Sequence, residues 1–269
     1  MAEKKKQRLD TLIVDRGLAE TIEHAQRLIG AGCVRVENRI CDKAGCLVDV
    51  SCALAVKTAK RFVSRGGDKL EAALNGLGLN VCGLTCADIG CSTGGFTDCL
   101  LQRGARRVYC VDVGYGLLDW KLRQDERVVV FERTNARHLT RRHIAEPLDL
   151  AVIDASFISL EPLLAPLQSF FSDTIRILAL VKPQFQLPRG LVGQGGIVDD
   201  ADLHQLALDM VRRFGEDLGL HCADIVPSPV RGAKGNQEFF MLLTNSSTGE
   251  NQGLKNREQG DCDVVATTG

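Results

Sequence analysis

The sequence predicts an α/β protein with a doubly wound, mostly parallel seven-stranded sheet and a small α+β domain ahead of it. Between residues 83 and 245, apolar runs of strand length alternate with stretches of helical periodicity, as in a parallel sheet covered by helices. A glycine-rich turn follows the first of these runs, where such sheets bind a nucleotide. With 269 residues and 45% hydrophobic composition, the chain can bury one large domain and one small domain.

The N-terminal region is expected to begin with a short helix. Leu9, Leu12 and Ile13 recur at helical spacing over residues 8–18, and Gly17 supplies a stop.

A second helix and a hairpin are expected to follow. Thr21 is a good N-cap, and residues 30–32, which contain two glycines, end the helix. The alternating residues 33–36 predict a strand, and residues 37–38 predict the turn to its partner. We assign residues 1–60 to this small domain.

Residues 61–82 are expected to contain a linker and the first helix of the large domain. Ser64 can cap a helix that ends near Gly78, with Leu70 on its inner side. Lys69 falls in the first turn, where the helix dipole disfavours a cation. From the sequence, both a solvated surface lysine and a functional lysine fit that position.

The large domain covers residues 83–245. Its expected strands are residues 86–90, 107–113, 128–131, 148–153, 175–181, 221–226 and 238–243. The segment 187–196 is too long and too rich in glycine for a simple connection, so we expect it to form a mobile lid. A long amphipathic helix is expected to follow at residues 200–218. Residues 246–269 are polar and aperiodic, which predicts a disordered tail.

The stretch from Cys86 to Thr97 predicts the cofactor, although a glycine-rich turn alone can also bind nothing. Its glycines do not follow the Gly-x-Gly-x-x-Gly spacing of dinucleotide-binding turns. The pattern Asp-x-Gly-x-x-x-Gly-Gly, which begins at Asp88, is instead similar to motif I of S-adenosylmethionine (SAM) methyltransferases. A carboxylate there suits the sulfonium and ammonium groups of SAM and is unfavourable beside a pyrophosphate.

Asp112 is the expected ligand of the cofactor ribose. It ends the next apolar run, 24 residues beyond Asp88, which is about the separation expected for an acid that binds a ribose diol. Asn135, just past the third strand, is expected on the adenine side. The expected cofactor set is Asp88, Gly90, Ser92, Thr93, Gly94, Phe96, Thr97, Asp112, Val113 and Asn135.

Composition and charge exclude several classes of protein. The net charge of −1 provides no overall attraction to nucleic acid, so RNA binding must depend on local basic patches. The 11 cysteines form no Cys-x-x-Cys pair and the five histidines lack ligand spacing, which predicts free buried thiols in a reducing cytosol and no metal. The sequence has neither an apolar N-terminal signal nor a run of about 18 apolar residues. We expect a cytoplasmic protein outside any membrane, and we expect a monomer.

The N-terminal domain has a modest basic excess, with eleven Lys and Arg against eight acids in residues 1–60, which an ordinary solvated face also explains. A resemblance favours RNA binding. The series Arg8-Leu-Asp, Gly17-Leu, Ala25-Gln-Arg-Leu-Ile29 and Gly32-x-Val34-x-Val36 resembles the small RNA-binding module named after the fourth protein of the small ribosomal subunit.

That module implies binding to structured RNA through shape and backbone charge. It usually has Ser-Arg where this chain has Thr21-Ile22, so one phosphate contact is missing or has moved to Arg27. The expected RNA contacts are Arg8, Arg16, Arg27, Arg35, Lys43, Arg65 and Phe157.

Four charged residues stand at the boundaries of regular elements near one sheet edge: Lys69, Asp154, Lys182 and Glu238. Catalytic groups collect at the carboxyl ends of parallel strands, although a charge can also simply end a strand. A Lys-Asp-Lys-Glu set resembles that of the FtsJ-type ribose 2′-O-methyltransferases.

Six motifs in the right order make the resemblance specific. Besides the N-terminal module, motif I and the four charged residues, these are Ser64-Arg-Gly-Gly, Asp154-x-Ser-Phe-Ile-Ser159 and Val181-Lys-Pro-Gln-Phe185. From about residue 8 to residue 243 the chain is very similar to the TlyA family. The resemblance implies SAM-dependent methylation of cytidine ribose in ribosomal RNA, with ribosomal subunits as partners. Some members of that family were named haemolysins.

The expected chemistry assigns a role to each charged residue. A ribose hydroxyl is a poor nucleophile and an ammonium cannot accept its proton, so one lysine must be uncharged when it acts. We assign Lys182 as general base, Lys69 as its cationic neighbour and substrate positioner, and Asp154 and Glu238 as orienting partners. Phe157 is expected to stack on the target base, although a core phenylalanine fits its position equally well.

Three other functions stay open on the sequence. A nicotinamide dehydrogenase would share the sheet but not the acid ahead of the glycines. A non-catalytic ribosome-associated protein would need only residues 8–60. A pore-forming haemolysin would need an insertion segment, and the sequence contains none that we can identify.

Overall fold

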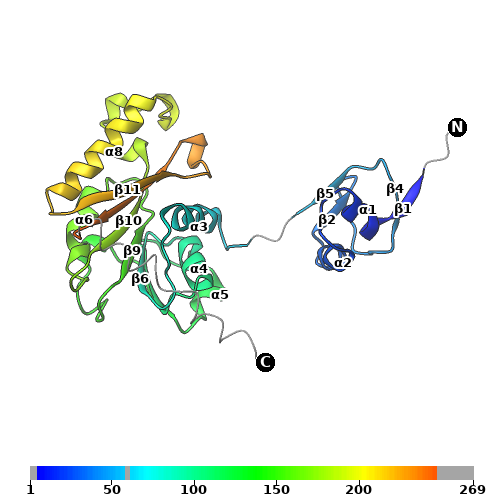
Figure 1. Ribbon diagram of the computed structural model, residues 1–269, viewed down its shortest axis with the longest axis horizontal. Coiled ribbons are helices and arrows are strands. Elements are labelled where there is room, and N and C mark those ends of the chain that lie inside the picture. Colours follow the sequence, from blue (N-terminus) through cyan, green and yellow to red (C-terminus); the bar gives the residue numbers. More distant parts are fainter. Residues whose placement is uncertain (1–4, 58–60, 247–269) are drawn as a thin grey trace. The chain divides into compact units, whose positions relative to one another are not determined.

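The structure, a computed structural model, describes residues 5–57 and 61–246 and divides into two compact units, Met1–Lys60 and Arg61–Gly269 (Figure 1). The expected disordered tail lies outside the described residues, apart from Ser246.

The N-terminal unit packs two helices against short strands. Its elements are β1 (Lys6–Arg8), α1 (Leu9–Asp15), α2 (Ile22–Gly30), β2 (Val34–Val36), β3 (Arg39–Ile40), β4 (Leu47–Asp49) and β5 (Leu54–Val56). Leu9, Ile13 and Ile29 are fully buried between them. Strands β3, β2 and β5 form one antiparallel sheet, and β1 pairs with β4. The expected helices and hairpin are present, but β4 and β5 lie in a region that showed no strand signal.

The large unit is built on a seven-stranded sheet, which confirms the predicted fold class. Its strands are β6 (Thr85–Ile89), β7 (Arg107–Val111), β8 (Val128–Phe131), β9 (Leu150–Ile153), β10 (Arg176–Val181), β11 (His221–Pro227) and β12 (Phe239–Thr244). Their order is β11-β12-β10-β9-β6-β7-β8. Pairing is parallel from β10 to β8, and β12 is antiparallel to both of its neighbours.

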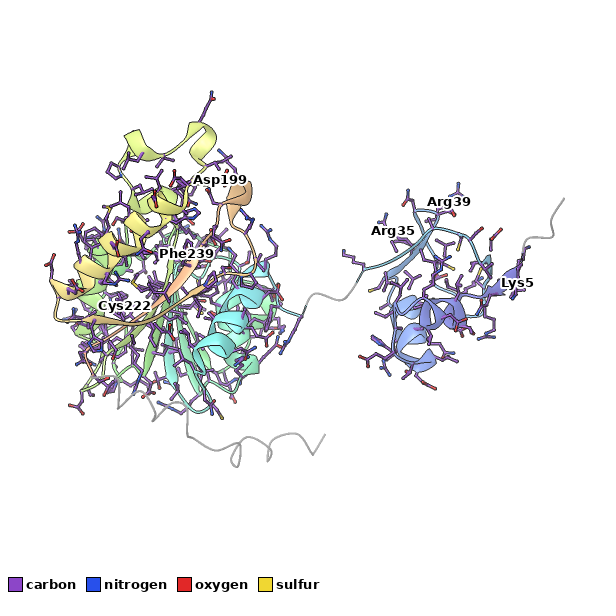
Figure 2. All side chains as sticks on the ribbon, turned by 45° about the horizontal axis from the view of Figure 1, so that its top comes forward. Lys5, Arg35, Arg39, Asp199, Cys222 and Phe239 are labelled. Carbon is purple, nitrogen blue, oxygen red and sulfur yellow. The ribbon has the colours of Figure 1, made fainter. Side chains whose placement is uncertain are left out.

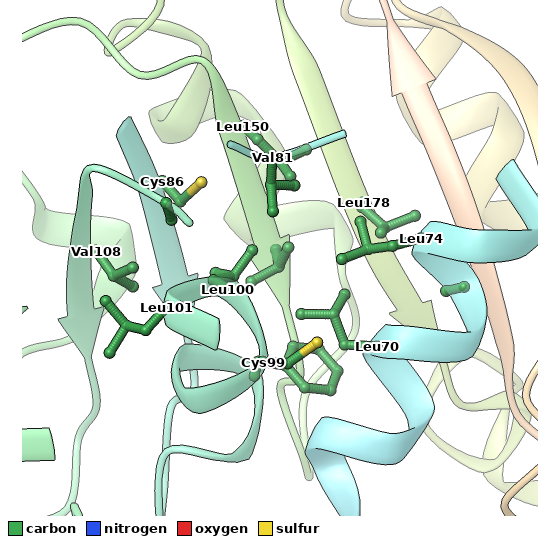
Figure 3. Packing of buried hydrophobic residues seen from close by; sticks show 14 of the residues in the cluster. Leu70, Leu74, Val81, Cys86, Cys99, Leu100, Leu101, Val108, Leu150 and Leu178 are labelled. Carbon is green, nitrogen blue, oxygen red and sulfur yellow. The ribbon is translucent and has the colours of Figure 1, made fainter. Parts of the chain in front are cut away.

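Helices cover both faces of this sheet. On one face, α3 (Arg65–Leu77) and α4 (Gly95–Gln102) contribute Leu70, Leu74, Cys99 and Leu100 to a buried cluster against the strands (Figure 3). On the other face, α6 (Glu161–Gln168) and α8 (Ala201–Glu216) cover a second cluster. The shorter helices are α5 (Trp120–Arg123), α7 (Pro183–Gln186), η1 (Ala136–His138), η2 (Arg189–Leu191), η3 (Gln194–Gly196) and η4 (Ala233–Gly235).

The start of α3 is fixed against α4. The Ser64 hydroxyl accepts a hydrogen bond from Gly66 N, which caps the helix as expected. Phe62 is buried, and a Cβ at Gly67 would lie 2.2 Å from its ring. Val63 N donates to Asp98 Oδ2 across 2.9 Å. Residues 62 and 63, expected in a linker, therefore belong to the core of the large unit.

The glycine-rich segment 187–198 is anchored at both ends, because Leu187 and Val198 pack together with Ala207 of α8. Its opening as a lid stays a prediction.

Nine described cysteines are free thiols. Within the described part of the chain, no helix is both long enough and apolar enough to cross a membrane.

Candidate active site

A polar cavity of about 220 Å³ opens at the carboxyl end of β6, where the motif I turn meets the start of α3. Its wall includes Asp88, Asp154 and Lys69, so charged groups from three separate segments face one space. The other lining residues are Ser64, Arg65, Gly66, Gly90, Cys91, Ser92, Thr93, Gly95 and Phe96.

Asp88 supplies a buried, half-satisfied carboxylate to this cavity. Its Oδ2 accepts hydrogen bonds from Thr97 N and Thr97 Oγ1, at 3.0 and 2.7 Å. Its Oδ1 is buried and has no hydrogen-bond partner among the described residues. Burial raises the pKa of Asp88 to about 7, although the bonds from Thr97 act in the opposite direction. A cation in the cavity would satisfy Oδ1 and favour the ionised form.

Glycines let the motif I turn approach its neighbours closely. Gly90 has φ of 84°, and a Cβ there would lie 2.6 Å from the Asp154 carbonyl oxygen. A Cβ at Gly95 would lie 2.2 Å from Ser64 Oγ. Any side chain at these two positions would push β9 or the start of α3 away from the turn.

A second cavity, of about 490 Å³, adjoins the first and shares Gly90, Ser92 and Asp154 with it. Its walls are mainly apolar and include Ile89, Val111, Val113, Leu117, Thr134, Asn135, Ala136, Ile158 and Leu163. Apolar walls of this kind suit a flat purine ring.

Asp112 stands in the second cavity at the turn. Its Oδ2 accepts a hydrogen bond from Ser92 N at 2.8 Å, and its Oδ1 accepts one from Gly114 N at 2.7 Å. Each carboxylate oxygen can accept a second bond, so the residue can brace the turn and still bind a diol. Asn135 caps η1 through its side-chain oxygen, which accepts from Arg137 N.

The two cavities fit SAM. The unpaired oxygen of Asp88 faces the space that suits the cationic amino-acid end, Asp112 suits the ribose, and the apolar cavity suits the adenine. Gly94 and Thr97, both expected to contact the methionine part, lie behind the cavity wall. A Cβ at Gly94 would meet Leu118 and Leu122, and the Thr97 hydroxyl contacts Asp88.

The four charged residues form two lysine–carboxylate pairs. Lys69 Nζ donates to Glu238 Oε2 at 2.6 Å, and Lys182 Nζ lies 2.6 Å from Asp154 Oδ1. The strand register relates the pairs, because Val181 of β10 faces Phe239 of β12, which places Lys182 across from Glu238. The structure therefore brings together all four residues that the sequence singled out.

Several residues at the site were missed by sequence reasoning. The Ser156 hydroxyl accepts a hydrogen bond from Lys182 Nζ at 2.7 Å. Its position inside the Asp154-x-Ser motif was an available signal. Leu117 and Thr134 line the apolar cavity from loops that follow β7 and β8, and no sequence pattern distinguishes them.

The expected RNA contacts differ in their surroundings. The Arg8 guanidinium is paired with the buried Asp10, and Arg16 donates to the carbonyl oxygens of Val50 and Cys52. Both arginines therefore also stabilise the fold of the N-terminal unit. Arg27, Arg35 and Lys43 are exposed. Figure 2 shows Arg35 and its neighbour Arg39 projecting from the hairpin.

Two expected RNA contacts lie on the large unit. Arg65 is exposed and lines the polar cavity. Phe157 is 91% exposed, has φ of 65° and lies with its ring 5.3 Å from that of Phe185. It is therefore not a core phenylalanine, and the strained backbone that presents it is typical of functional sites.

Comparison with known proteins gives two family matches. Residues 62–245 match the FtsJ-like methyltransferase family, and residues 7–51 match the S4 domain. TlyA of Mycobacterium tuberculosis, a 16S/23S rRNA (cytidine-2′-O)-methyltransferase, is 46% identical over 88% of this chain and 89% of its own. Hemolysin A of Brachyspira hyodysenteriae is 38% identical over 87% of this chain and 98% of its own.

A solved structure of a haemolysin-like protein from Streptococcus thermophilus is 40% identical, covers 94% of this chain and 95% of its own, and has a TM-score of 0.68. These matches favour a methyltransferase over a nicotinamide dehydrogenase and over a non-catalytic RNA binder. The chain, which joins an S4 domain to the catalytic sheet, is therefore a SAM-dependent methyltransferase and belongs to the FtsJ-like family in the TlyA group.

Proposed function

We propose that the protein methylates the 2′-hydroxyl of cytidine in ribosomal RNA, with Lys182 as the general base. One observation carries the proposal: two lysine–carboxylate pairs stand side by side at the sheet edge that also lines the cofactor cavity. A reaction that removes a proton from a neutral hydroxyl needs a basic group there. Among the four residues, Lys182 contacts both an acid and a hydroxyl that can orient its amine.

The substrate class is supported by the relatives and by the N-terminal unit. The Mycobacterium tuberculosis relative is named for cytidine 2′-O-methylation of 16S and 23S rRNA. Residues 7–51 match the S4 domain, which supports RNA binding by the N-terminal unit. The exposed Arg27, Arg35 and Lys43 supply positive charge for phosphate contacts. We propose ribosomal subunits as partners, a cytoplasmic location, a monomeric enzyme and no metal.

Asp154 links cofactor binding to the base. When bound, SAM supplies an electrophilic methyl group on a positively charged sulfur. Asp154 lines the cavity and also pairs with Lys182, so a cation in that cavity shares the carboxylate and weakens its hold on the Lys182 ammonium. Lys182 can then release its proton and accept one from the ribose.

The transfer step itself needs no covalent intermediate on the enzyme. With SAM bound, the methyl group would pass directly from sulfur to the 2′-oxygen, and Lys182 Nζ would take the hydroxyl proton. Lys69, held by Glu238, stays charged and positions the ribose oxygen. Phe157 stands exposed beside the cavity as a stacking surface for the target base, and Arg65 stands at the polar cavity for an RNA phosphate.

The direct test is incubation of purified ribosomal subunits with methyl-labelled SAM and the enzyme, followed by mapping of 2′-O-methylated nucleotides. We expect label at cytidine in one or both subunits, and far slower labelling with Lys182→Ala. Label on a base rather than a ribose would reject the proposed reaction. Lysis of erythrocytes by the purified protein in a parallel assay would support the haemolysin names of some relatives.

A further inference from the structure

Asn236 joins two loops that approach the catalytic edge. Its side chain is 2% exposed. Its Oδ1 accepts a hydrogen bond from Val198 N at 2.9 Å, and its Nδ2 donates to Gly196 O at 2.8 Å. A longer bond of 3.3 Å runs from Nδ2 to Ala233 O. This buried amide therefore ties the glycine-rich segment 187–198 to the turn at residues 232–236, ahead of β12, and an exposed hydrogen bond from Lys234 Nζ to Gly195 O joins the same two segments.

That turn forms a wall against the Glu238 carboxylate. Gly232 N donates to the Asn236 carbonyl at 2.8 Å, which closes the turn. A Cβ at Gly232 would lie 1.9 Å from Glu238 Oε1 and 2.5 Å from Glu238 Cδ. The backbone of Gly232 does not require glycine, because its φ is −73°. Glycine is therefore needed at this position because a side chain would occupy the space of the Glu238 carboxylate.

Glu238 is thus held from two sides. Its Oε2 accepts a hydrogen bond from Lys69, its Oε1 faces Gly232, and the residue as a whole is 2% exposed. The Glu238 carboxylate has little room to rotate as long as the Gly232 backbone stays in place. The wall in turn depends on the buried amide of Asn236, which contacts none of the four charged residues through its side chain in the bonds described.

We propose that Asn236 is a positioning residue that fixes the Lys69–Glu238 pair by locking segment 187–198 to the Gly232 turn. The inference concerns the methyl-transfer step and rests on the proposed function for its catalytic readout, but the position of Lys69 can be tested without any substrate. Asn236 is not one of the four charged residues. Its side chain affects the reaction only through Glu238.

A matched control exists in the same domain. Asn245 also joins two segments, because its Oδ1 accepts from Ile175 N and its Nδ2 donates to Asp173 O, both at 2.8 Å. It follows the opposite end of β12 from Glu238. Asn245→Ala removes the same type of bonds as Asn236→Ala without disturbing the Gly232 turn.

The first test is lysine labelling with an amine-reactive reagent, read by mass spectrometry on full-length protein. We expect faster modification of Lys69 in Asn236→Ala and in Gly232→Ala, and parental modification in Asn245→Ala. Melting temperatures identify any variant that fails to fold, and Asn236→Asp, which keeps an acceptor for Val198 N but loses the donor to Gly196 O, provides a second variant that also breaks the tie. Parental labelling of Lys69 in folded Asn236 and Gly232 variants overturns the proposal.

The second test measures single-turnover methyl transfer at saturating SAM and ribosomal subunits. Misplacement of a catalytic group by about 1 Å can cost on the order of 10²-fold, so we expect a loss approaching that for Asn236→Ala with near-parental affinity for SAM. Asn236→Ala combined with Glu238→Gln should be no slower than Glu238→Gln alone, because both act through one group. Additive losses overturn the proposal. If labelling changes as expected but the parent methylates no cytidine ribose, the proposed function fails and the positioning role stands.

Discussion

Lys182 and Asp154 follow neighbouring parallel strands, and their Nζ and Oδ1 atoms lie 2.6 Å apart. Asp154 also lines the cofactor cavity, so one carboxylate serves both the base and the bound cation. Lys182 can act here in one of two ways. It can be a base that must first release its own proton, or it can supply only a fixed positive charge.

Replacement of Lys182 distinguishes these two roles. Lys182→Ala should lower methyl transfer by about 10²- to 10⁴-fold, the usual contribution of general-base catalysis, with little change in SAM or RNA affinity. Lys182→Arg should fail almost as badly, because a guanidinium stays protonated and cannot accept the ribose proton. Single-turnover kinetics with labelled SAM measure both variants.

Lys121→Ala is the control for this series. Lys121 also pairs with an aspartate, since its Nζ lies 3.1 Å from Asp98 Oδ1, but it lies outside both cavities. Its loss should leave the rate near that of the parent. Near-parental turnover by Lys182→Arg would instead move the base to another residue or to water.

Asp88 should make SAM binding depend on pH. The free protein holds this carboxyl with a pKa raised to about 7 by burial, whereas a bound cation favours the ionised form. Binding below pH 7 must therefore release a proton, so affinity should increase as pH rises toward 7, by about tenfold per pH unit well below the pKa, and then level off.

Titration calorimetry between pH 5.5 and 7.5 in buffers of different ionisation enthalpy measures the slope and the released proton. The control is Asp88→Asn, whose side-chain oxygen can still accept from Thr97 N and Oγ1. This variant should bind more weakly and without the slope. Equal slopes in the parent and the variant would assign the titration to another group.

Asp112→Ala should weaken SAM binding by roughly 1.5 to 3 kcal/mol, the range for hydrogen bonds to a charged group. RNA affinity should hardly change. The weaker SAM binding would come from two lost interactions: the bond to the ribose, and the hydrogen bond that Asp112 accepts from Ser92 N. A useful comparison is Asp125→Ala, because Asp125 likewise accepts a backbone N–H, from Arg127, at a site away from both cavities. If Asp112→Ala binds SAM as the parent does, the ribose assignment is wrong.

Removal of residues 1–60 should abolish methylation of intact subunits while SAM affinity stays close to normal. The two units have separate cores, and the cut leaves Phe62, Val63 and Ser64 in place at the start of α3. Binding of the full chain to subunits should weaken steeply with added salt. Filter binding, calorimetry and methyl transfer compare the two proteins. Full activity of the shortened chain on subunits would show that the N-terminal unit is dispensable.

The sheet could be predicted because its strands are long, buried on both faces and separated by helices, which leaves clear apolar runs. The motif I turn was equally clear, since glycine is needed where Gly90 passes the end of β9. Strands β4 and β5 were not, because three-residue strands with exposed, half-buried and buried positions show no usable alternation. Their pairing is fixed by partners elsewhere in the small unit.

The candidate site was predictable as a set of residue types but not as a set of contacts. From its place in the helix, Lys69 fitted a surface lysine as well as a functional one, and the structure shows it buried and paired with Glu238, 169 residues later. Local sequence carries no signal for such a distant partner. The unpaired oxygen of Asp88 and the space requirement at Gly232 depend on packing in the same way.

The direction of β12 has a consequence for the order in which this enzyme matures. Glu238 reaches the catalytic edge only because β12 runs antiparallel beside β10, and β11 joins the sheet only through β12. Both cofactor cavities are lined entirely by residues between 64 and 163. The lining residues of both cavities are therefore synthesised before the residue that completes the catalytic set. Lys69 gains its partner only once Glu238 has been made, so the Lys69–Glu238 pair forms after the whole cofactor lining has been synthesised.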